Sequence, residues 1–110
     1  MNVRDVDAAE AFALVEGDAV LLDVRQPEEF ERGHAPMATL VSLSELPERL
    51  DELPRDALIV CVCRSGGRST RAALFLLEAG FDVANVEGGM LAWAAANLPL
   101  ESDSGDATIE

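Results

Sequence analysis

The sequence contains no lysine, few aromatic residues, two cysteines and no long apolar run. Its 8 basic residues are all arginine and face 21 acidic residues, which gives a formal net charge of −13. This balance argues against nucleic acids and membranes as partners. Residues 1–10 contain acids and no apolar stretch, so we expect neither a secretory signal nor a membrane-spanning segment.

The two cysteines lie two positions apart and cannot form a disulfide framework. This cysteine usage favours a reducing, cytoplasmic location. A zinc site could draw only on Cys61, Cys63 and the single histidine, His34, which is one ligand short of a closed tetrahedral site. We therefore expect no metal and no cofactor.

Short apolar runs alternate with segments that have helical spacing. The runs at 19–24 and 57–62 are continuous and aliphatic, as is typical of strands buried on both faces of a parallel sheet. Weaker strands are expected around Val3 and Val6 and in 39–43, with a last strand beginning at residue 82. Helices are predicted at 7–17, 27–33, 44–54, 69–80 and 90–97. Segment 69–80 is apolar nearly all round, as is expected of a crossover helix that is covered by its neighbours. This alternation predicts an α/β domain with a mainly parallel sheet.

The predicted domain covers residues 1–100. The last ten residues, ESDSGDATIE, are polar and acidic and have little to bury. We expect residues 101–110 to form a disordered tail.

A basic cluster follows the second strong strand, in the stretch VCVCRSGGRST (60–70). Arg64, Arg68 and Arg71 fall within eight positions, and no acidic residue occurs between Asp56 and Glu78. In a chain this acidic, such a cluster indicates a site that binds an anion.

Cys63 ends the strand and precedes a helix that is expected to start near Ser69. Gly66 and Gly67 free the backbone of side-chain hindrance, so the N–H groups of residues 64–69 could curl around the sulfur. These amides, the helix N-terminus and the arginines all favour a thiolate. The pattern therefore predicts a nucleophilic cysteine, and the alternative is a small buried residue that ends a strand.

Counting residues separates this loop from two others. A Walker-type phosphate loop requires a lysine, and the chain has none. A cysteine phosphatase loop would place five residues between cysteine and arginine, whereas only four separate Cys63 from Arg68. The smaller ring favours sulfur chemistry over a tetrahedral phosphate.

Other polar residues near this predicted edge of the sheet admit two interpretations. Asp23 and Arg25 end the first strong strand, and either contact a substrate or form an ion pair that supports the loop, which we favour. Cys61 shares a strand face with Cys63, about 6.6 Å away along the strand. It is either a resolving thiol or, as we favour, a core residue. Glu28 and Glu29 read as ordinary solvated acids.

The chain resembles the single-domain rhodanese family of sulfurtransferases over about residues 3–99. The resemblance is carried by LLDVRQPEEFERGHAP (21–36), CRSGGRST (63–70), AGFDVANVEGG (79–89) and the pair Ala92–Trp93. It implies a three-layer domain, with a central parallel sheet and helices on both faces. It also implies that Cys63 carries a sulfur atom as a persulfide.

The resemblance further assigns roles to individual residues. Cys63 would be the nucleophile, and His34 would stabilise a turn, which adds it to Asp23 and Arg25 as structural support near the site. The residues that would surround the outer sulfur and bind the donor are Arg64, Ser65, Gly66, Gly67, Arg68 and Ser69. The implied donor is thiosulfate, from which sulfite leaves, and the implied acceptor is cyanide, a thiol or a protein.

The chain departs from the family where members commonly read GHIPGAxNIP, since it reads GHAPMATLVSL. Met37, Leu40 and Ser42 replace the usual glycine, asparagine and proline, which alters a turn beside the site and bears on the choice of acceptor. Two alternatives stay open. One is a non-catalytic or sulfur-relay module that serves a protein partner, and the other is a phosphatase or arsenate reductase on a related fold.

Overall fold

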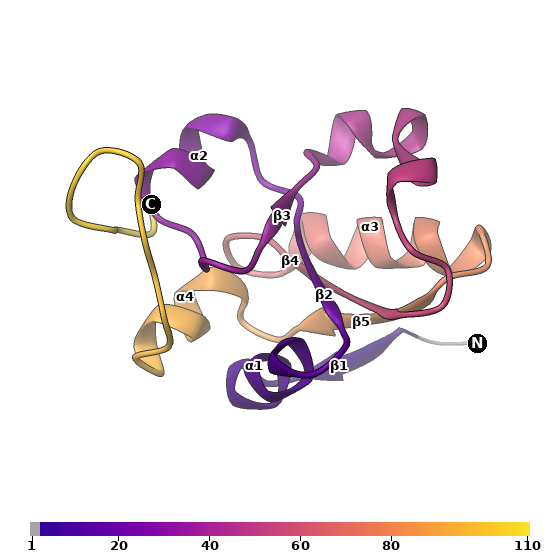
Figure 1. Cartoon of the computed structure of the whole chain (residues 1–110), viewed down its shortest axis with the longest axis horizontal. Coiled ribbons are helices and arrows are strands. Elements are labelled where there is room, and N and C mark those ends of the chain that lie inside the picture. Colours follow the sequence, from indigo (N-terminus) through magenta and orange to yellow (C-terminus); the bar gives the residue numbers. More distant parts are fainter. Residues whose placement is uncertain (1–2) are drawn as a thin grey trace.

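A parallel sheet of five strands, in the order β1-β5-β4-β2-β3, forms the centre of the computed structural model, which describes residues 3–110 (Figure 1). The strands are β1 (Arg4–Val6), β2 (Val20–Asp23), β3 (Thr39–Leu40), β4 (Leu58–Val62) and β5 (Asp82–Val86). The two continuous aliphatic runs form β2 and β4, which pair with each other inside the sheet. Burial on both faces explains why neither run alternates with polar residues.

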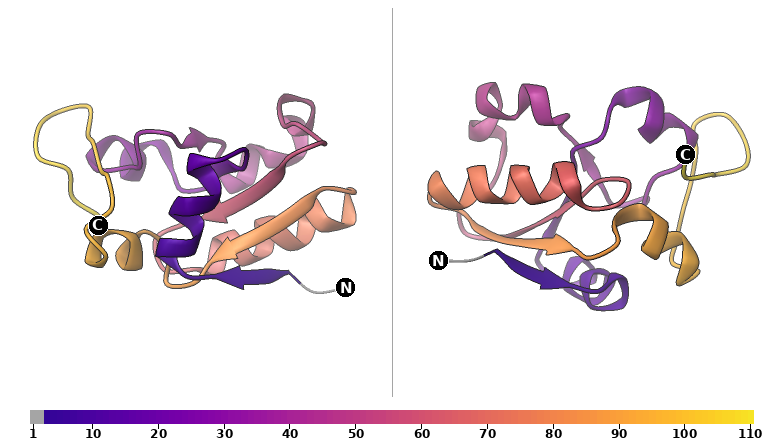
Figure 2. Two further views of the ribbon diagram at one scale, coloured as in Figure 1. Left: turned by 60° about the horizontal axis from the view of Figure 1, so that its bottom comes forward. Right: turned by 180° about the vertical axis from the view of Figure 1, so that it is seen from behind.

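Helices cover both faces of this sheet (Figure 2). One face packs against α1 (Ala8–Glu16) and α4 (Gly89–Ala95), and the other against α3 (Gly67–Glu78). The short helix α2 (Pro27–Arg32) follows β2. The predicted three-layer α/β fold is confirmed.

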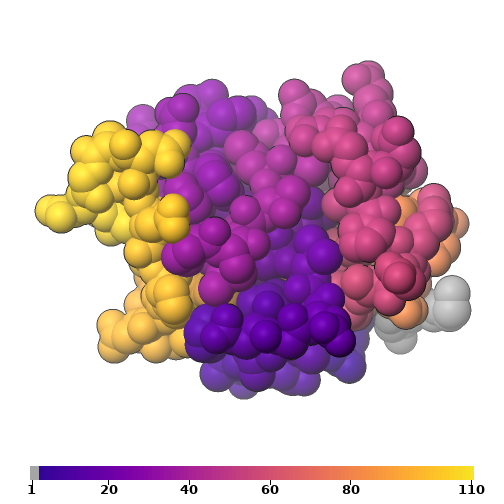
Figure 3. Space-filling model, in the orientation of Figure 1, coloured from indigo at the N-terminus to yellow at the C-terminus, as the bar shows by residue number. Residues whose placement is uncertain are grey.

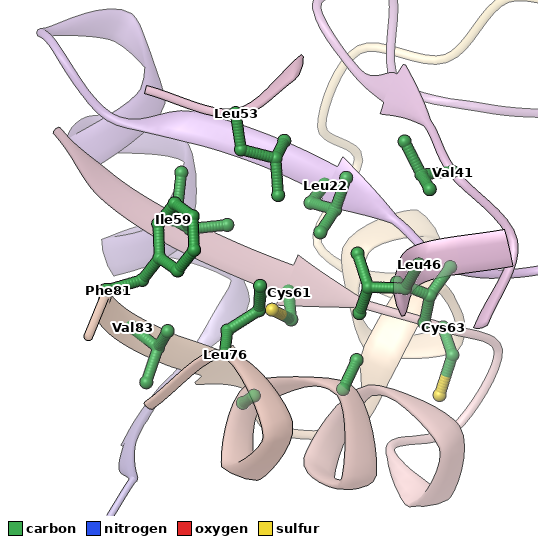
Figure 4. Packing of buried hydrophobic residues seen from close by; sticks show 13 residues of the cluster. Leu22, Val41, Leu46, Leu53, Ile59, Cys61, Cys63, Leu76, Phe81 and Val83 are labelled. Carbon is green, nitrogen blue, oxygen red and sulfur yellow. The ribbon is translucent and has the colours of Figure 1, made fainter. Parts of the chain in front are cut away.

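The core consists of two apolar clusters, one on each side of the sheet. Alternate residues of β4 supply both: Ile59 and Cys61 belong to the cluster under α3, and Val60 and Val62 to the cluster under α1 and α4. Figure 4 shows the first cluster, in which Cys61 and Cys63 belong to the same face. Side chains two positions apart share a face, as the period of a strand requires.

The segment predicted as one helix at 44–54 instead forms two short 3₁₀ helices, η1 (Leu43–Glu48) and η2 (Leu50–Glu52). Pro47 lies inside η1. A proline lacks the N–H donor that an α-helix needs and clashes with the preceding turn, which accounts for the tighter and interrupted geometry.

Helix α3 differs from its prediction in two respects. It starts at Gly67 rather than near Ser69, because Gly66, at φ 128°, turns the chain directly into the helix. It is also not covered all round, since Leu74 and Phe75 are exposed. Only the side that carries Ala72, Ala73 and Leu76 faces the sheet.

The last ten residues run beside α2. The Thr108 N–H donates to the Arg32 carbonyl oxygen at 2.8 Å, and Glu101 and His34 pair as an antiparallel bridge. Ile109 packs against the cluster that contains Trp93. In Figure 3 this tail is a yellow ridge at the end of the molecule. Backbone hydrogen bonds join the segment to α2 and to the turn that follows it, and both the domain boundary at residue 100 and the disorder of the tail stay predictions.

Across residues 3–110, no helix combines the length and apolarity that crossing a membrane requires.

Candidate functional site

Cys63 lies where β4 ends, at the carboxyl edge of the sheet. Its carbonyl oxygen accepts a hydrogen bond from the Met90 N–H at 2.8 Å, and the Arg64 carbonyl oxygen accepts one from Leu91 at 3.1 Å. The start of α4 thus holds the loop backbone immediately after β4. Open α/β sheets bind ligands at this edge.

The Cys63 sulfur sits in a cradle of hydrogen-bonding groups. The Gly66 N–H lies 3.1 Å from Sγ, the Ser69 N–H 3.3 Å from it, and the Ser69 hydroxyl oxygen also 3.3 Å. Both amides belong to the turn that starts α3. Donors converging on one atom can stabilise a negative charge there.

The two cysteines differ in acidity. Burial raises the pKa of Cys63, but the Ser69 side chain and the amides of Ser69, Gly66 and Ser65 lower it by more, so that it ends below its ordinary value. Burial, with a smaller contribution from Cys63, raises the pKa of Cys61 to about 12. Cys61 is therefore a core thiol, and Cys63 is the more acidic of the two, as a reactive cysteine needs to be.

Asn85 is a site residue that the sequence prediction missed. Its Oδ1 accepts a hydrogen bond from the Ser69 hydroxyl at 2.6 Å, and its Nδ2 donates to Asp5 Oδ1 at 3.1 Å. Asn85 is buried, and it lies opposite Cys61 of the neighbouring strand β4 in the register of the sheet. The sequence signal that could have identified it is the single side-chain amide among the apolar residues of β5.

The Ser69 hydroxyl has one proton and three neighbouring acceptors: Asn85 Oδ1 at 2.6 Å, the Gly66 carbonyl oxygen at 3.2 Å and the Cys63 sulfur at 3.3 Å. While Cys63 is a thiol, its S–H donates to Ser69 Oγ and the hydroxyl proton goes to Asn85. Once the thiolate forms, the hydroxyl can turn its proton towards the sulfur. Asn85 therefore competes with the thiolate for this proton.

Replacing Ser69 with alanine should raise the pKa of the Cys63 thiol, because one donor to the thiolate is lost. Hydrogen bonds to charged groups contribute about 1.5–3 kcal/mol, so alkylation of Cys63 at pH 7 should slow by about tenfold or more. The rate should recover as the pH is raised through the new pKa. The measurement is the rate of iodoacetamide reaction against pH.

The control is Ser65→Ala, which removes a neighbouring hydroxyl that makes no hydrogen bond among residues 3–110. An unchanged pH profile in Ser69→Ala would show that the hydroxyl does not stabilise the thiolate.

Arg68 forms a bidentate ion pair with Glu29, at 2.6 Å and 2.9 Å. This hydrogen bonding lowers the pKa of Glu29 to about 2. The interpretation of Glu29 as an ordinary solvated acid was therefore wrong, because α2 folds over the start of α3 and brings together residues 39 positions apart. Any anion that binds Arg68 must share it with this carboxylate.

Asp23 and Arg25 form a fully buried ion pair behind the loop. Arg25 Nη2 lies 2.7 Å from Asp23 Oδ2 and donates to the Gly33 carbonyl at 2.8 Å. The Ser42 hydroxyl in turn donates to the Arg25 carbonyl at 2.8 Å. Neither charged side chain reaches solvent. The pair joins the end of β2 to the turn after α2.

His34 stabilises the same turn. Its ring stacks on Phe30, with 3.8 Å between the centroids, and Nδ1 lies 2.6 Å from the Phe30 carbonyl oxygen. No cluster of three or more histidine, cysteine, aspartate or glutamate side chains suited to a metal occurs in the part of the chain that the structure describes.

Comparison with known proteins agrees with this geometry. The model of the rhodanese-like domain family matches residues 7–96. The chain is 37% identical over 101 residues to YtwF of Bacillus subtilis, covering 90% of this chain and 98% of that protein. It is 38% identical over 89 residues to a protein of Allochromatium vinosum named a sulfurtransferase, covering 80% and 83%.

The fold has equally similar relatives among solved structures. A rhodanese-related protein from Thermoplasma volcanium superposes with a TM-score of 0.84 at 32% identity, covering 89% of this chain and 97% of that one. The anchors of the resemblance, namely the strand and turn around Asp23, the Cys63 loop and the turn into α4, are the segments that build the site. The chain belongs to the rhodanese-like domain family.

Proposed function

We propose that the protein is a sulfurtransferase that moves a sulfane sulfur from thiosulfate, through a persulfide on Cys63, to a thiol, cyanide or protein acceptor. The observation that carries the proposal is the Cys63 thiol itself, which is acidified inside a cradle of backbone amides. The Allochromatium vinosum relative, named a sulfurtransferase, supports sulfur transfer in general. Thiosulfate as the donor is supported by the three arginines of the basic cluster and by the lack of acids in residues 57–77 of the sequence.

In the first half-reaction, the Cys63 thiolate attacks the outer sulfur of thiosulfate. A new S–S bond forms, the old one breaks, and its electron pair leaves with sulfite. The amides of Gly66 and Ser69 stabilise the negative charge on the sulfur. Arg64 is exposed beside the loop and is free to attract the sulfonate, whereas Arg68 has to divide its charge between that group and Glu29.

In the second half-reaction, a nucleophilic acceptor attacks the outer sulfur of the persulfide. The bond between the two sulfur atoms breaks, and Cys63 leaves as a thiolate. The cradle that lowers the pKa of Cys63 also makes it a better leaving group. No oxidant or reductant is needed, because the sulfane sulfur changes only its partner.

The test is the intact mass of the reduced protein after brief thiosulfate treatment and desalting. The natural chain should gain one sulfur atom, and cyanide should remove it. The Cys63→Ser variant should gain none, while Cys61→Ala should behave like the natural chain because Cys61 is a core thiol. A folded, reduced protein that gains no sulfur would contradict the proposal. Phosphate-ester or arsenate turnover that depends on Cys63 would then favour the phosphatase or reductase alternative.

A further inference from the structure

A cavity of about 610 Å³ lies between α3 and η1, next to the Cys63 loop. Its walls include Gln26, Leu43, Pro47, Arg68, Arg71 and Phe75. This volume is in the range of small-molecule sites. Of these residues, only Arg68 has been given a role in the site so far.

The cavity lies beside the helix turn that contacts the reactive sulfur, because Arg68 lines the cavity and directly precedes Ser69. Arg68, Arg71 and Phe75 are spaced three and four residues apart, so they share one face of α3. The first turn of the same helix donates the Ser69 N–H to Cys63 Sγ. On the other wall, Leu46 lines the cavity and belongs to the same apolar cluster as Cys63 (Figure 4).

The charges along the cavity wall are not balanced. Arg68 is paired with Glu29, but Arg71 makes no ion pair or side-chain hydrogen bond among residues 3–110. Residues 57–77 contain no acid that could neutralise it. In a chain of net charge −13, the cavity therefore offers an unneutralised cation to an anionic ligand.

Apolar groups complete the walls. The Phe75 side chain lines the cavity although the residue is 37% exposed, and Leu43 and Pro47 lie opposite it on η1. A ligand that fits these walls has a short apolar body and a negative end. Arg68 lines the cavity and its neighbour Ser69 contacts Cys63 Sγ, so a ligand that extends from Arg71 past Arg68 points towards the turn that holds the sulfur.

We propose that this cavity is the acceptor site and that it takes a small thiol carrying a carboxylate. Arg71 binds the carboxylate, and Phe75 and Leu43 contact the methylene groups. The acceptor thiolate attacks the outer sulfur of the Cys63 persulfide and departs as a persulfide, leaving Cys63 as a thiolate. This inference rests on the proposed function for its chemistry but not for the binding site itself.

The first test measures binding without chemistry. The probe, 3-(methylthio)propionate, carries the carboxylate and cannot accept sulfur, and its uncharged match is 3-(methylthio)propan-1-ol. Titration followed by ¹H–¹⁵N correlation spectra should move the amide signals of α3 and η1 with the carboxylate, and much less with the alcohol. Arg71→Gln should weaken carboxylate binding by about fivefold, as expected for a partly exposed ion pair.

The matched control is Arg4→Gln, which changes the net charge equally on an exposed residue of β1. Equal binding of the carboxylate and the alcohol, shifts elsewhere in the spectrum, or an equal loss in both variants would overturn the inference.

The second test measures sulfur transfer from protein already loaded with one sulfur. Transfer to 3-mercaptopropionate should be about fivefold slower in Arg71→Gln, while transfer to uncharged 2-mercaptoethanol changes less than twofold. An equal effect on both thiols would overturn the acceptor role. If the natural chain takes up no sulfur but still binds the carboxylate probe at the cavity, the proposed function fails and the anion site stands.

Discussion

Replacing Asp23 with alanine should lower the free energy of unfolding by about 3–5 kcal/mol, the usual cost of leaving one charge of a buried pair without its partner. Arg25 is fully buried, and its guanidinium donates three hydrogen bonds to the Asp23 carboxylate, at 2.7–3.1 Å. After the substitution, its remaining side-chain partner is the Gly33 carbonyl. A total stability of about 5–15 kcal/mol is typical of a domain, so a substantial part would be lost.

Urea denaturation of the variant gives this energy directly. The matched control is the double variant Asp23→Leu with Arg25→Met, which removes both charges and fills similar volume. Its free energy of unfolding should be closer to that of the natural chain than the value for Asp23→Ala is, because no unpaired charge stays in the core. A loss below about 1 kcal/mol in the single variant would show that this pair contributes little to stability.

Replacing Gly89 with alanine should slow persulfide formation by at least about tenfold. Gly89 has φ 59°, and a β-carbon there would lie 2.5 Å from the carbonyl oxygens of Cys63 and Arg64. Both contacts are with backbone, so the loop itself must move. The left-handed conformation adds about 1–2 kcal/mol for a residue other than glycine.

The physical reason for this loss is that the start of α4 holds the Cys63 loop. The same two carbonyls accept the N–H groups of Met90 and Leu91, so a displaced loop would also displace the amides that surround the sulfur. The measurements are sulfur uptake from thiosulfate and the rate of Cys63 alkylation, with circular dichroism to check the fold. The control is Gly105→Ala, at φ 139° but with no atom within 4 Å of the added carbon. Equal sulfur uptake in the two variants would contradict the role of this contact.

Most of the fold could be predicted because its signals are local. The aliphatic runs of β2 and β4, the Asp7 cap and Gly17 stop of α1, and the order of strands and helices all follow from neighbouring residues. The prediction of one helix at 44–54 was wrong because the apolar spacing of the segment suits a helix, while Pro47 prevents a regular one. The exposed face of α3 could not be foreseen, since it depends on where its neighbours end.

The candidate site likewise has a part that local sequence predicts and a part that it does not. A strand end, two glycines and a helix start lie within one short stretch, so Cys63 and its surrounding amides could be read from residue order alone. The partners that adjust this site come from elsewhere in the chain. Glu29 reaches Arg68 from 39 positions away, and Asn85 reaches Ser69 from 16.

The sequence by itself determined the α/β fold, the family and the place of the Cys63 loop between a strand and a helix, because backbone preferences and short spacings decide these over a few residues. Only the tertiary structure decided which arginines of the basic cluster form ion pairs and which do not. Arg68 is neutralised by Glu29 and Arg71 is not, although both lie in the same basic cluster. An ion pair depends on the packing of α2 against α3, and such packing is settled by the whole core rather than by the residues that form the pair.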